Sequence, residues 1–468
     1  MGSTGVEALR AGLSGDVILP GDPGYDDARK VFNSMIDRRP AVIARCASTD
    51  DVVAAVRFGA ENDLPIAVRS GGHSVAGMSI CDDGILVDLG GLKRIEVDPA
   101  TRTARAGGGV LWGEFDAATQ EHGLHTPGGR VTTTGVGGFT TGGGYGWTSS
   151  KHGLTCDNLI SAEVVLADGR VVTASQEENA DLFWGIRGGS GNFGVVTDFE
   201  FQLHELGPIV LAGLALWPLE RASEVFRGWR DYVDAAPDEL STACVMITAP
   251  SEDFVPDRLK GQVAVGMAAM YVGDPEEGAG VLQPLRDLGP EVDLIQPMPY
   301  TAFQAILDPS APPGMRNYWR GEYMSRLPDE AIDTFVTHAP DVAAAGMPLS
   351  QMIIFRIGQG VTAISNDATA FSHRDADYLF HPISVWENPA DDGRVVAANR
   401  AFADAMRPFG TGAAYLNFTP ETDRIRDAYG DAKYERLVAL KDKYDPENLF
   451  RGNQNIKPSR ATEEPALA

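Results

Sequence analysis

The feature that most constrains this chain is the glycine-rich run over residues 128–147, which also carries several threonines. Glycine at this density disfavours a regular helix or strand, because it loses more conformational freedom on folding than other residues do. It favours loops whose backbone N–H groups face an anion, with threonine hydroxyl groups as further donors. We therefore expect a loop that binds a phosphate-containing ligand, and a dinucleotide pyrophosphate suits it.

A second glycine-containing turn, residues 69–77, follows the apolar run Pro65–Val68, which is typical of a buried strand. Two adjacent glycines precede His73 in this turn. On this evidence alone, His73 is either satisfied by local hydrogen bonds or presented to a ligand. The glycine spacing differs from the Gly-x-Gly-x-x-Gly of nicotinamide-binding folds, so a nicotinamide dehydrogenase is disfavoured.

Local patterns predict the remaining elements. Residues 40–69 indicate a strand, a helix and a second strand, since Ser48 is a suitable N-cap residue before Asp50 and Asp51. The other expected elements are hairpins over 95–106 and 162–174, helices over 110–122, 219–235 and 426–450, and strands over 209–216, 262–271 and 352–357.

Four separated motifs occur in one order along the chain, at residues 70–74, 142–146, 182–196 and 444–450. With these motifs the chain resembles, over nearly its whole length, FAD-linked oxidases of the vanillyl-alcohol oxidase type. The subgroup that it resembles is that of the berberine-bridge enzymes, whose FAD domain is of the PCMH type.

This resemblance implies an α+β fold with three parts. A two-subdomain, PCMH-type FAD-binding domain is expected over residues 1–208, with its core over about 36–208. A substrate-binding domain is expected over 209–425, built on an antiparallel sheet with helices on one face. Residues 426–468 are expected to return to the FAD domain, and the chain is expected to fray from about Pro458.

The resemblance also implies that His73 is bonded covalently to the 8α-methyl carbon of the flavin. Val131 stands where some relatives carry a second, cysteinyl attachment, so FAD is expected to be held by one covalent bond. Other expected FAD contacts are Arg69, Ser70, Gly71, Gly72, Ser74, Val75, Gly77, Thr133, Thr134, Gly137, Gly138, Thr141, Gly142, Gly143, Gly144, Gly153, Val195, Asn417, Asn453 and Asn455.

For catalysis, Thr134 matches a position that governs oxygen access in the family, although its hydroxyl group could instead satisfy the loop backbone. His381 matches a Glu or Gln position of plant relatives and is a candidate base, or else a histidine bonded to backbone. Phe418 replaces the tyrosine that is often the base, as in the nicotine-degrading oxidases of this family. Tyr145 and Trp147 are candidate active-site aromatics, with core packing as the alternative.

Two further residues have open interpretations. Arg356 lies in an apolar run, where it either binds an anionic substrate or pairs with an acid. Cys156 is expected to be a small buried residue. The cysteines show no pairing motif and no metal-ligand spacing, so no metal site is expected.

The expected function is an FAD-dependent oxidase. It would move a hydride from a small alcohol, amine, sugar or secondary metabolite to flavin N5, and O2 would reoxidise the flavin to give H2O2. An oxygenase that tailors a secondary metabolite and a flavin-binding protein without turnover remain as alternatives. The substrate and the oligomeric state stay open.

Composition excludes other classes of partner. The formal net charge of −26 argues against nucleic acid and against an anionic membrane surface. No apolar run approaches the length of a spanning helix, and the N-terminus lacks the regions of a signal peptide. A cytoplasmic protein with reduced thiols is therefore expected.

Overall fold

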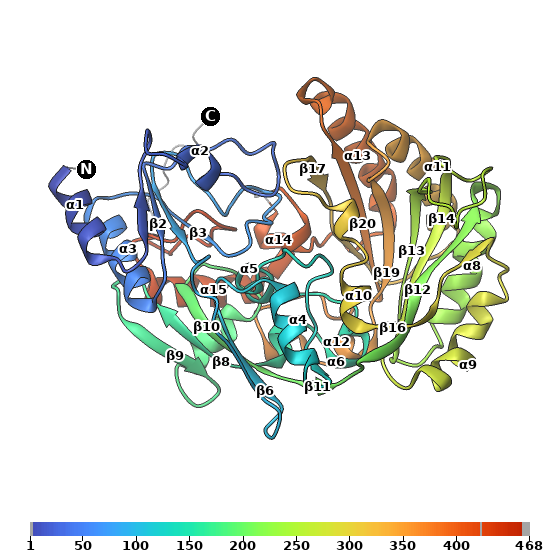
Figure 1. Cartoon of the computed structure of the whole chain (residues 1–468), viewed down its shortest axis with the longest axis horizontal. Coiled ribbons are helices and arrows are strands. Elements are labelled where there is room, and N and C mark those ends of the chain that lie inside the picture. The colour runs from blue at the N-terminus through green and yellow to red at the C-terminus, as the bar shows by residue number, and fades with distance from the viewer. Residues whose placement is uncertain (1–2, 422–423, 461–468) are drawn as a thin grey trace.

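The computed structural model describes residues 3–421 and 424–460. Figure 1 shows two halves side by side: N-terminal strands and helices on the left, and one large sheet with its helices on the right. The expected α+β class is confirmed. The expected fraying from about Pro458 falls largely on residues 461–468, which lie outside the described residues.

The first sheet of the left half contains the predicted strand–helix–strand unit. Strands β2 (Val42–Arg45) and β3 (Ile66–Arg69) both pair in parallel with β4 (Ile85–Asp88). The crossover between β2 and β3 is α3 (Thr49–Glu61), which begins where the Ser48 side chain accepts a hydrogen bond from the Asp51 N–H group. Strand β1 (Asp16–Ile18) adds to β2 in the antiparallel direction.

The second sheet of this half is antiparallel and contains both predicted hairpins. Its order is β5 (Ile95–Asp98), β6 (Thr103–Gly107), β10 (Val195–Gln202), β8 (Leu159–Val165) and β9 (Val171–Ser175). Helix α4 (Trp112–Gln120) is shorter than the expected 110–122, because Leu111 forms a β-bridge with Gly135. Its Trp112 and Phe115 pack against Phe201.

The glycine-rich run is not irregular throughout, and the expectation is wrong for six of its residues. Val136–Thr141 form the short helix α5. Val136 is fully buried and its N–H group donates to the Val110 carbonyl, while the Thr141 hydroxyl group donates to the Gly137 carbonyl at 3.1 Å. These anchors offset the low helix propensity of Gly137 and Gly138.

The right half is built on one nine-stranded sheet in which all neighbours are antiparallel. Its long strands are β12 (Ile209–Pro218), β14 (Val263–Tyr271), β13 (Leu240–Thr248), β19 (Gln351–Arg356) and β20 (Tyr378–Trp386). Short strands complete the edges: β15 (Val292–Asp293), β16 (Gln296–Pro299), β17 (Arg316–Trp319) and β18 (Glu322–Met324).

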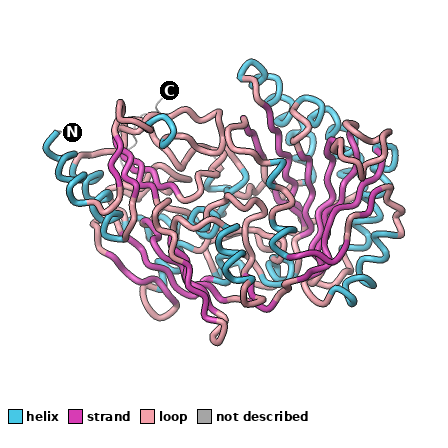
Figure 2. The backbone as a smooth tube through the Cα atoms, in the orientation of Figure 1, coloured by secondary structure: helices cyan, strands magenta, loops and turns pink. Residues whose placement is uncertain are grey.

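Helices cover one face of this sheet, as expected (Figure 2). They are α8 (Ala222–Val233), α9 (Pro275–Arg286), α11 (Asp329–Ala345) and α13 (Asp392–Met406). The core beneath them contains Trp217, Trp229, Phe335 and Phe402. Along β19, Met352 and Ile354 join this core, whereas Ile353 and Phe355 lie on the opposite face, as the alternation of a strand requires.

Smaller elements complete the chain: α1 (Ser3–Gly12), α2 (Tyr25–Ala28), β7 (Leu124–His125), α6 (Ser149–His152), α7 (Ala180–Ile186), β11 (His204–Glu205), α10 (Tyr300–Gln304) and α12 (Gln359–Thr362). No helix within the described ranges combines the length and the apolar composition needed to cross a membrane.

The C-terminal segment forms two helices where one was expected over 426–450. Helix α14 (Ile425–Tyr429) is separated from α15 (Asp431–Tyr444) by Gly430, whose φ of 74° breaks the helix. Helix α15 contacts α7, and Figure 1 shows it among the strands of the left half. The buried Lys441 ammonium group pairs with Asp445 at 2.7 Å and donates to the Asn192 carbonyl at 2.9 Å.

We propose the division into residues 1–208, 209–425 and 426–468 on these grounds. No strand pair within the described residues joins the sheets before residue 208 to the large sheet after it. The C-terminal Leu437, Leu440 and Ile456 share a core with Phe183 and Phe199 of the left half.

Candidate active site

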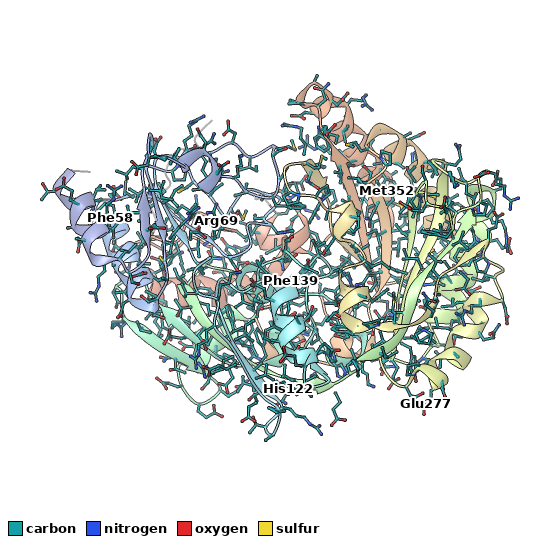
Figure 3. The ribbon with its side chains drawn as sticks, viewed as in Figure 1. Phe58, Arg69, His122, Phe139, Glu277 and Met352 are labelled. Carbon is teal, nitrogen blue, oxygen red and sulfur yellow. The ribbon has the colours of Figure 1, made fainter. Side chains whose placement is uncertain are left out.

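A cavity of about 310 Å³ is lined by residues from both halves and from the C-terminal segment. One wall comes from the turn after β3, the glycine-rich run, and the loop before β10. The opposite wall comes from β19 and β20 of the large sheet. Phe139, labelled near the middle of Figure 3, lines this cavity.

Two glycine-containing segments meet backbone to backbone beneath the cavity. A Cβ atom added at Gly71 would overlap the backbone of Gly135, and one added at Gly135 would overlap Gly71 and Ser70. The Ser70 hydroxyl group donates to the Gly108 carbonyl at 2.7 Å and accepts from the Gly137 N–H group at 3.3 Å. Glycine is therefore required at the contact between these two segments.

His73 lies at this junction and lines the cavity. Its imidazole stacks on Phe32, with ring centroids 4.2 Å apart, and its Nε2 atom lies 2.8 Å from the Thr133 hydroxyl oxygen. Burial lowers the pKa of His73 to about 4. The ring is thus neutral at neutral pH, and Nδ1 has no hydrogen-bond partner among the described residues.

The cavity wall offers open space beside two glycines and unpaired amide oxygens from the C-terminal segment. Gly138 and Gly191 line the cavity, and the space that a Cβ atom would occupy at each is open. The side-chain oxygens of Asn453 and Gln454 are buried at the wall and have no hydrogen-bond partner among the described residues. Such unpaired acceptors suit the donor groups of a bound nucleotide, so these residues fit FAD.

The structure brings most of the sequence-predicted site residues to this cavity. Those that line it are Ser70, Gly71, Gly72, His73, Ser74, Val75, Thr134, Gly137, Gly138, Thr141, Tyr145, Val195, His381, Asn417 and Asn453.

Other predicted site residues do not line the cavity: Arg69, Gly77, Thr133, Gly142, Gly143, Gly144, Trp147, Gly153 and Asn455. The guanidinium group of Arg69 pairs with the buried Asp88 at 2.7 Å, which ties the end of β3 to β4. Gly142 packs against Asn417, leaving no room for a Cβ atom. The Gly144 N–H group donates to the Tyr415 hydroxyl group at 3.1 Å.

On the opposite wall, His381 is held in one tautomer. Its Nδ1 atom lies 2.6 Å from the Arg320 carbonyl oxygen, which only accepts, so Nδ1 carries the proton and Nε2 carries a lone pair. The ring stacks on Phe418, with centroids 3.9 Å apart. Burial lowers the pKa of His381 to about 3. A neutral imidazole whose Nε2 lacks a partner among the described residues is thus available at the cavity.

Asn417 connects this wall to the glycine-rich run. Its side-chain amide donates to the Phe139 carbonyl at 3.2 Å and to the Tyr415 hydroxyl group at 3.1 Å. Both Asn417 and Phe418 line the cavity. Phe418 has no ionisable group, so the neutral imidazole of His381 stacked on it is the candidate proton acceptor on this wall.

Arg130 lines the cavity, although it was not among the predicted site residues. Its guanidinium carbon lies 4.1 Å from the ring centre of Phe355, 4.5 Å from that of Tyr145 and 4.7 Å from that of Trp147. Tyr145 in turn donates to the Arg356 carbonyl at 2.7 Å. The available signal was that Arg130 is the only charged residue in the run 128–147.

Trp319, Ile353 and Phe355 also line the cavity and were missed. No local sequence signal distinguishes them, because an apolar strand residue gives the same pattern whether it faces a hydrophobic core or a ligand.

The open interpretations of Arg356 and Cys156 are decided by their surroundings. Arg356 pairs with Asp377 at 3.0 Å and Asp234 at 3.4 Å and does not line the cavity, so it is a structural ion pair. Cys156 is buried, as expected, and so are Cys46, Cys81 and Cys244.

Comparison with known proteins gives two family matches in this chain. Residues 40–175 match the model of an FAD binding domain, and residues 414–457 match the model described as "Berberine and berberine like". The chain is 31% identical to (R)-6-hydroxynicotine oxidase of Paenarthrobacter nicotinovorans, over 95% of this chain and 97% of that protein.

Solved structures agree with these matches. The crystal structure of 6-hydroxy-D-nicotine oxidase from Arthrobacter nicotinovorans has a TM-score of 0.85 and 29% identity, covering 96% of this chain and 98% of that one. Glucooligosaccharide oxidase from Acremonium strictum, described with a 6-S-cysteinyl, 8α-N1-histidyl FAD, has a TM-score of 0.85 and 26% identity, covering 97% and 99%.

Proposed function

The chain belongs to the FAD-linked oxidoreductases of the berberine-bridge-enzyme-like type, and we propose that it is an oxidase holding FAD through one covalent bond to His73. The relatives that it matches over nearly their whole length include enzymes named oxidases. The protein is therefore an FAD-linked oxidoreductase, and the alternative of a flavin-binding protein without turnover is set aside.

The observation that carries the proposal is the convergence of His73 and His381 on one cavity. His73 is presented from the FAD-binding half and His381 from the large sheet opposite, so a flavin and a substrate would meet between them. When bound, FAD supplies the electron acceptor, taking a hydride at N5 and passing the electrons to O2 to give H2O2.

Three features of His73 support covalent attachment at this residue, and Val131 supports a single bond. The ring is neutral, its Nε2 atom is engaged by Thr133, and Nδ1 is left for the bond to the flavin. Val131 lines the cavity but carries no thiol, so the second, cysteinyl bond described for glucooligosaccharide oxidase has no equivalent here.

His381 is proposed to accept the substrate proton. The Arg320 carbonyl fixes the proton on Nδ1, which leaves the Nε2 lone pair to bind an O–H or N–H group of the substrate. A base held in one orientation within hydrogen-bond reach typically contributes about 10²- to 10⁴-fold to the rate.

Similar proteins act on small organic substrates, as the names nicotine oxidase and glucooligosaccharide oxidase state. We propose a small organic substrate for this site too. The test is a panel of alcohols, amines, sugars and phenols, scored by anaerobic bleaching of the flavin and by peroxide release in air. Bleaching without peroxide would overturn the use of O2, and a panel without any bleaching would count against the oxidase.

Flavin attachment is tested separately by acid precipitation. The yellow colour is expected in the pellet of the unaltered protein and in the supernatant of His73→Ala. His381→Ala is the matched control and is expected to keep its colour in the pellet. Colour that remains with the His73→Ala pellet would overturn the assignment.

A second candidate, an oxygenase, is favoured by one observation: Thr134, at the position linked to oxygen access, lines the cavity. Product mass separates the two reactions, because an oxidase removes two hydrogens and an oxygenase adds an oxygen atom.

A further inference from the structure

Arg130 is buried without a counter-charge. Only 8% of its surface is exposed; its Nη2 atom donates to the Gly146 carbonyl at 3.2 Å, and the neutral hydroxyl group of Tyr145 also interacts with it. The Nε atom is buried with no partner in the described part of the chain, and no carboxylate there lies within ion-pair distance of the guanidinium group.

Three of the other buried arginines within the described residues have acids beside them. Arg69 pairs with Asp88 at 2.7 Å, Arg320 with Glu322 at 2.9 Å, and Arg374 is paired with Asp157. Arg187 lacks such a pair but donates to two backbone carbonyls and does not line the cavity. Arg130 differs because it lines the cavity.

The aromatic rings around Arg130 offset only part of the cost of burying its charge. Phe355, Tyr145 and Trp147 present their faces to the cation, and of the three only Tyr145 adds a neutral hydroxyl oxygen that interacts with the guanidinium N–H groups. Burial lowers the pKa of Arg130 to about 10, so the side chain stays charged at neutral pH. A buried charge of this kind is normally paired.

The remainder of the wall is free of competing charge. Among the described residues that line the cavity, Arg130 is the only Asp, Glu, Lys or Arg. On the side of the large sheet, His381 is neutral and most other lining residues are apolar or aromatic, among them Leu307, Trp319, Ile353, Phe355, Ile383 and Phe418. This combination fits a ligand with one anionic group on an apolar body.

We propose that the substrate of this site carries a carboxylate on an aromatic or aliphatic body, and that this carboxylate pairs with Arg130. This inference rests on the proposed function, because it takes the ligand of Arg130 to be the substrate of the proposed oxidase. A guanidinium group binds a carboxylate through two parallel hydrogen bonds, so Arg130 also orients the ligand.

Carboxylate binding also affects His381. Burial and, to a smaller degree, the charge of Arg130 lower the pKa of the His381 ring. A carboxylate on Arg130 neutralises that charge, which raises the pKa of His381 and makes it a stronger base. Arg130 thereby favours catalysis on acidic substrates over their neutral analogues.

The test compares benzoate with benzamide, which share shape but differ in charge. Calorimetric titration of the flavin-loaded protein at pH 7.5 is expected to show benzoate binding about tenfold or more tightly than benzamide, since a charged hydrogen-bonded pair is lost in the amide. Arg130→Gln is expected to weaken benzoate by a similar factor and to leave benzamide unchanged. Arg356→Gln, which removes a cation outside the cavity, is the matched control and should leave both affinities unchanged.

Equal binding of benzoate and benzamide to the unaltered protein, or binding of neither, would overturn the proposal even if Arg130→Gln fails to fold. An Arg130→Gln protein that keeps the full preference for benzoate over benzamide would also overturn the proposal. If the flavin absorbance of that variant changes while the preference stays, Arg130 acts on the flavin instead. The proposed function is tested by separate measurements, the acid-stable flavin colour and the bleaching of the flavin by substrate. Failure of the proposed function can therefore be told apart from failure of this inference.

Discussion

The Nε2 atom of His73 lies 2.8 Å from the Oγ1 atom of Thr133, and this contact joins the turn after β3 to the glycine-rich run. The two residues are far apart in the sequence, yet together they set the orientation of the imidazole. With Phe32 stacked on one face of the ring, His73 has little freedom to turn away from the cavity.

Thr133→Val is expected to reduce covalent attachment of the flavin, because the imidazole loses the partner that holds Nε2. A hydrogen bond contributes about 0.5–1.5 kcal/mol, so the rate of attachment should fall about 2- to 10-fold. The measurement is the fraction of acid-stable flavin over time in freshly produced protein. Thr133→Ser keeps the hydroxyl group and should behave as the unaltered protein, whereas normal attachment in Thr133→Val would show that the contact is incidental.

His381→Asn is expected to slow flavin reduction by substrate about 10²- to 10⁴-fold while leaving flavin content unchanged. Rapid-mixing absorbance under anaerobic conditions measures this step. Because burial holds the pKa of His381 near 3, the ring stays neutral from pH 8 to pH 5 in the unliganded protein. Protonation of His381 therefore should not lower the rate of flavin reduction between pH 8 and pH 5. Unaltered reduction kinetics in the His381→Asn variant would exclude His381 as the base.

Asp116→Asn is expected to stabilise the protein above neutral pH. Asp116 is buried, and Gln304 donates to it at 2.9 Å; burial raises the pKa of the carboxyl group to about 7. The folded state thus retains a proton that the unfolded state releases near pH 4, and stability falls as the pH rises from about 4 to about 7.

At pH 8 the Asp116→Asn gain in unfolding free energy should be roughly 2–4 kcal/mol, and near pH 4 it should vanish. Chemical denaturation at the two pH values measures it. The exposed Asp253→Asn is the control for loss of one negative charge. An Asp116→Asn effect that does not depend on pH would contradict the assignment.

His152→Gln is expected to reduce the sensitivity of the protein to acid. The rings of His152 and His204 stack with centroids 4.0 Å apart, and burial lowers the pKa of His152 to about 3. The unfolded state takes up a proton near pH 6.5, so the stability from a neutral His152 is present above that pH and is lost as the pH falls from about 6.5 to 3.

Between pH 7 and pH 5, this effect lowers the free energy of unfolding by about 2 kcal/mol. His152→Gln should remove this contribution to the pH dependence of the unfolding free energy. Denaturation curves at several pH values test it. His338→Gln, at an exposed position on α11, is the control and should not change the slope. Identical acid sensitivity in His152→Gln and the unaltered protein would refute the role of this histidine.

Much of the fold was predictable because it depends on local patterns. The run from Val42 to Arg69 carries strand and helix signals at the correct spacing, and the structure forms β2, α3 and β3 there. The predicted element boundaries that were wrong lie where a distant contact or a single backbone angle starts or ends the element. Leu111 bridges to Gly135, Gly430 breaks the C-terminal helix, and Val136 is buried deeply enough to support a helix among glycines.

The amino-acid sequence by itself determined the chemical groups of the candidate site: His73 in its turn, the glycines that allow two backbones to meet, and a phenylalanine in place of a phenol at 418. Only the tertiary structure decided which groups share the cavity and in what state. It paired Arg356 with acids, left Arg130 unpaired, and fixed the proton of His381 on Nδ1. The physical reason is that desolvation, ion pairing and tautomer depend on neighbours from other parts of the chain, and residue spacing does not encode them.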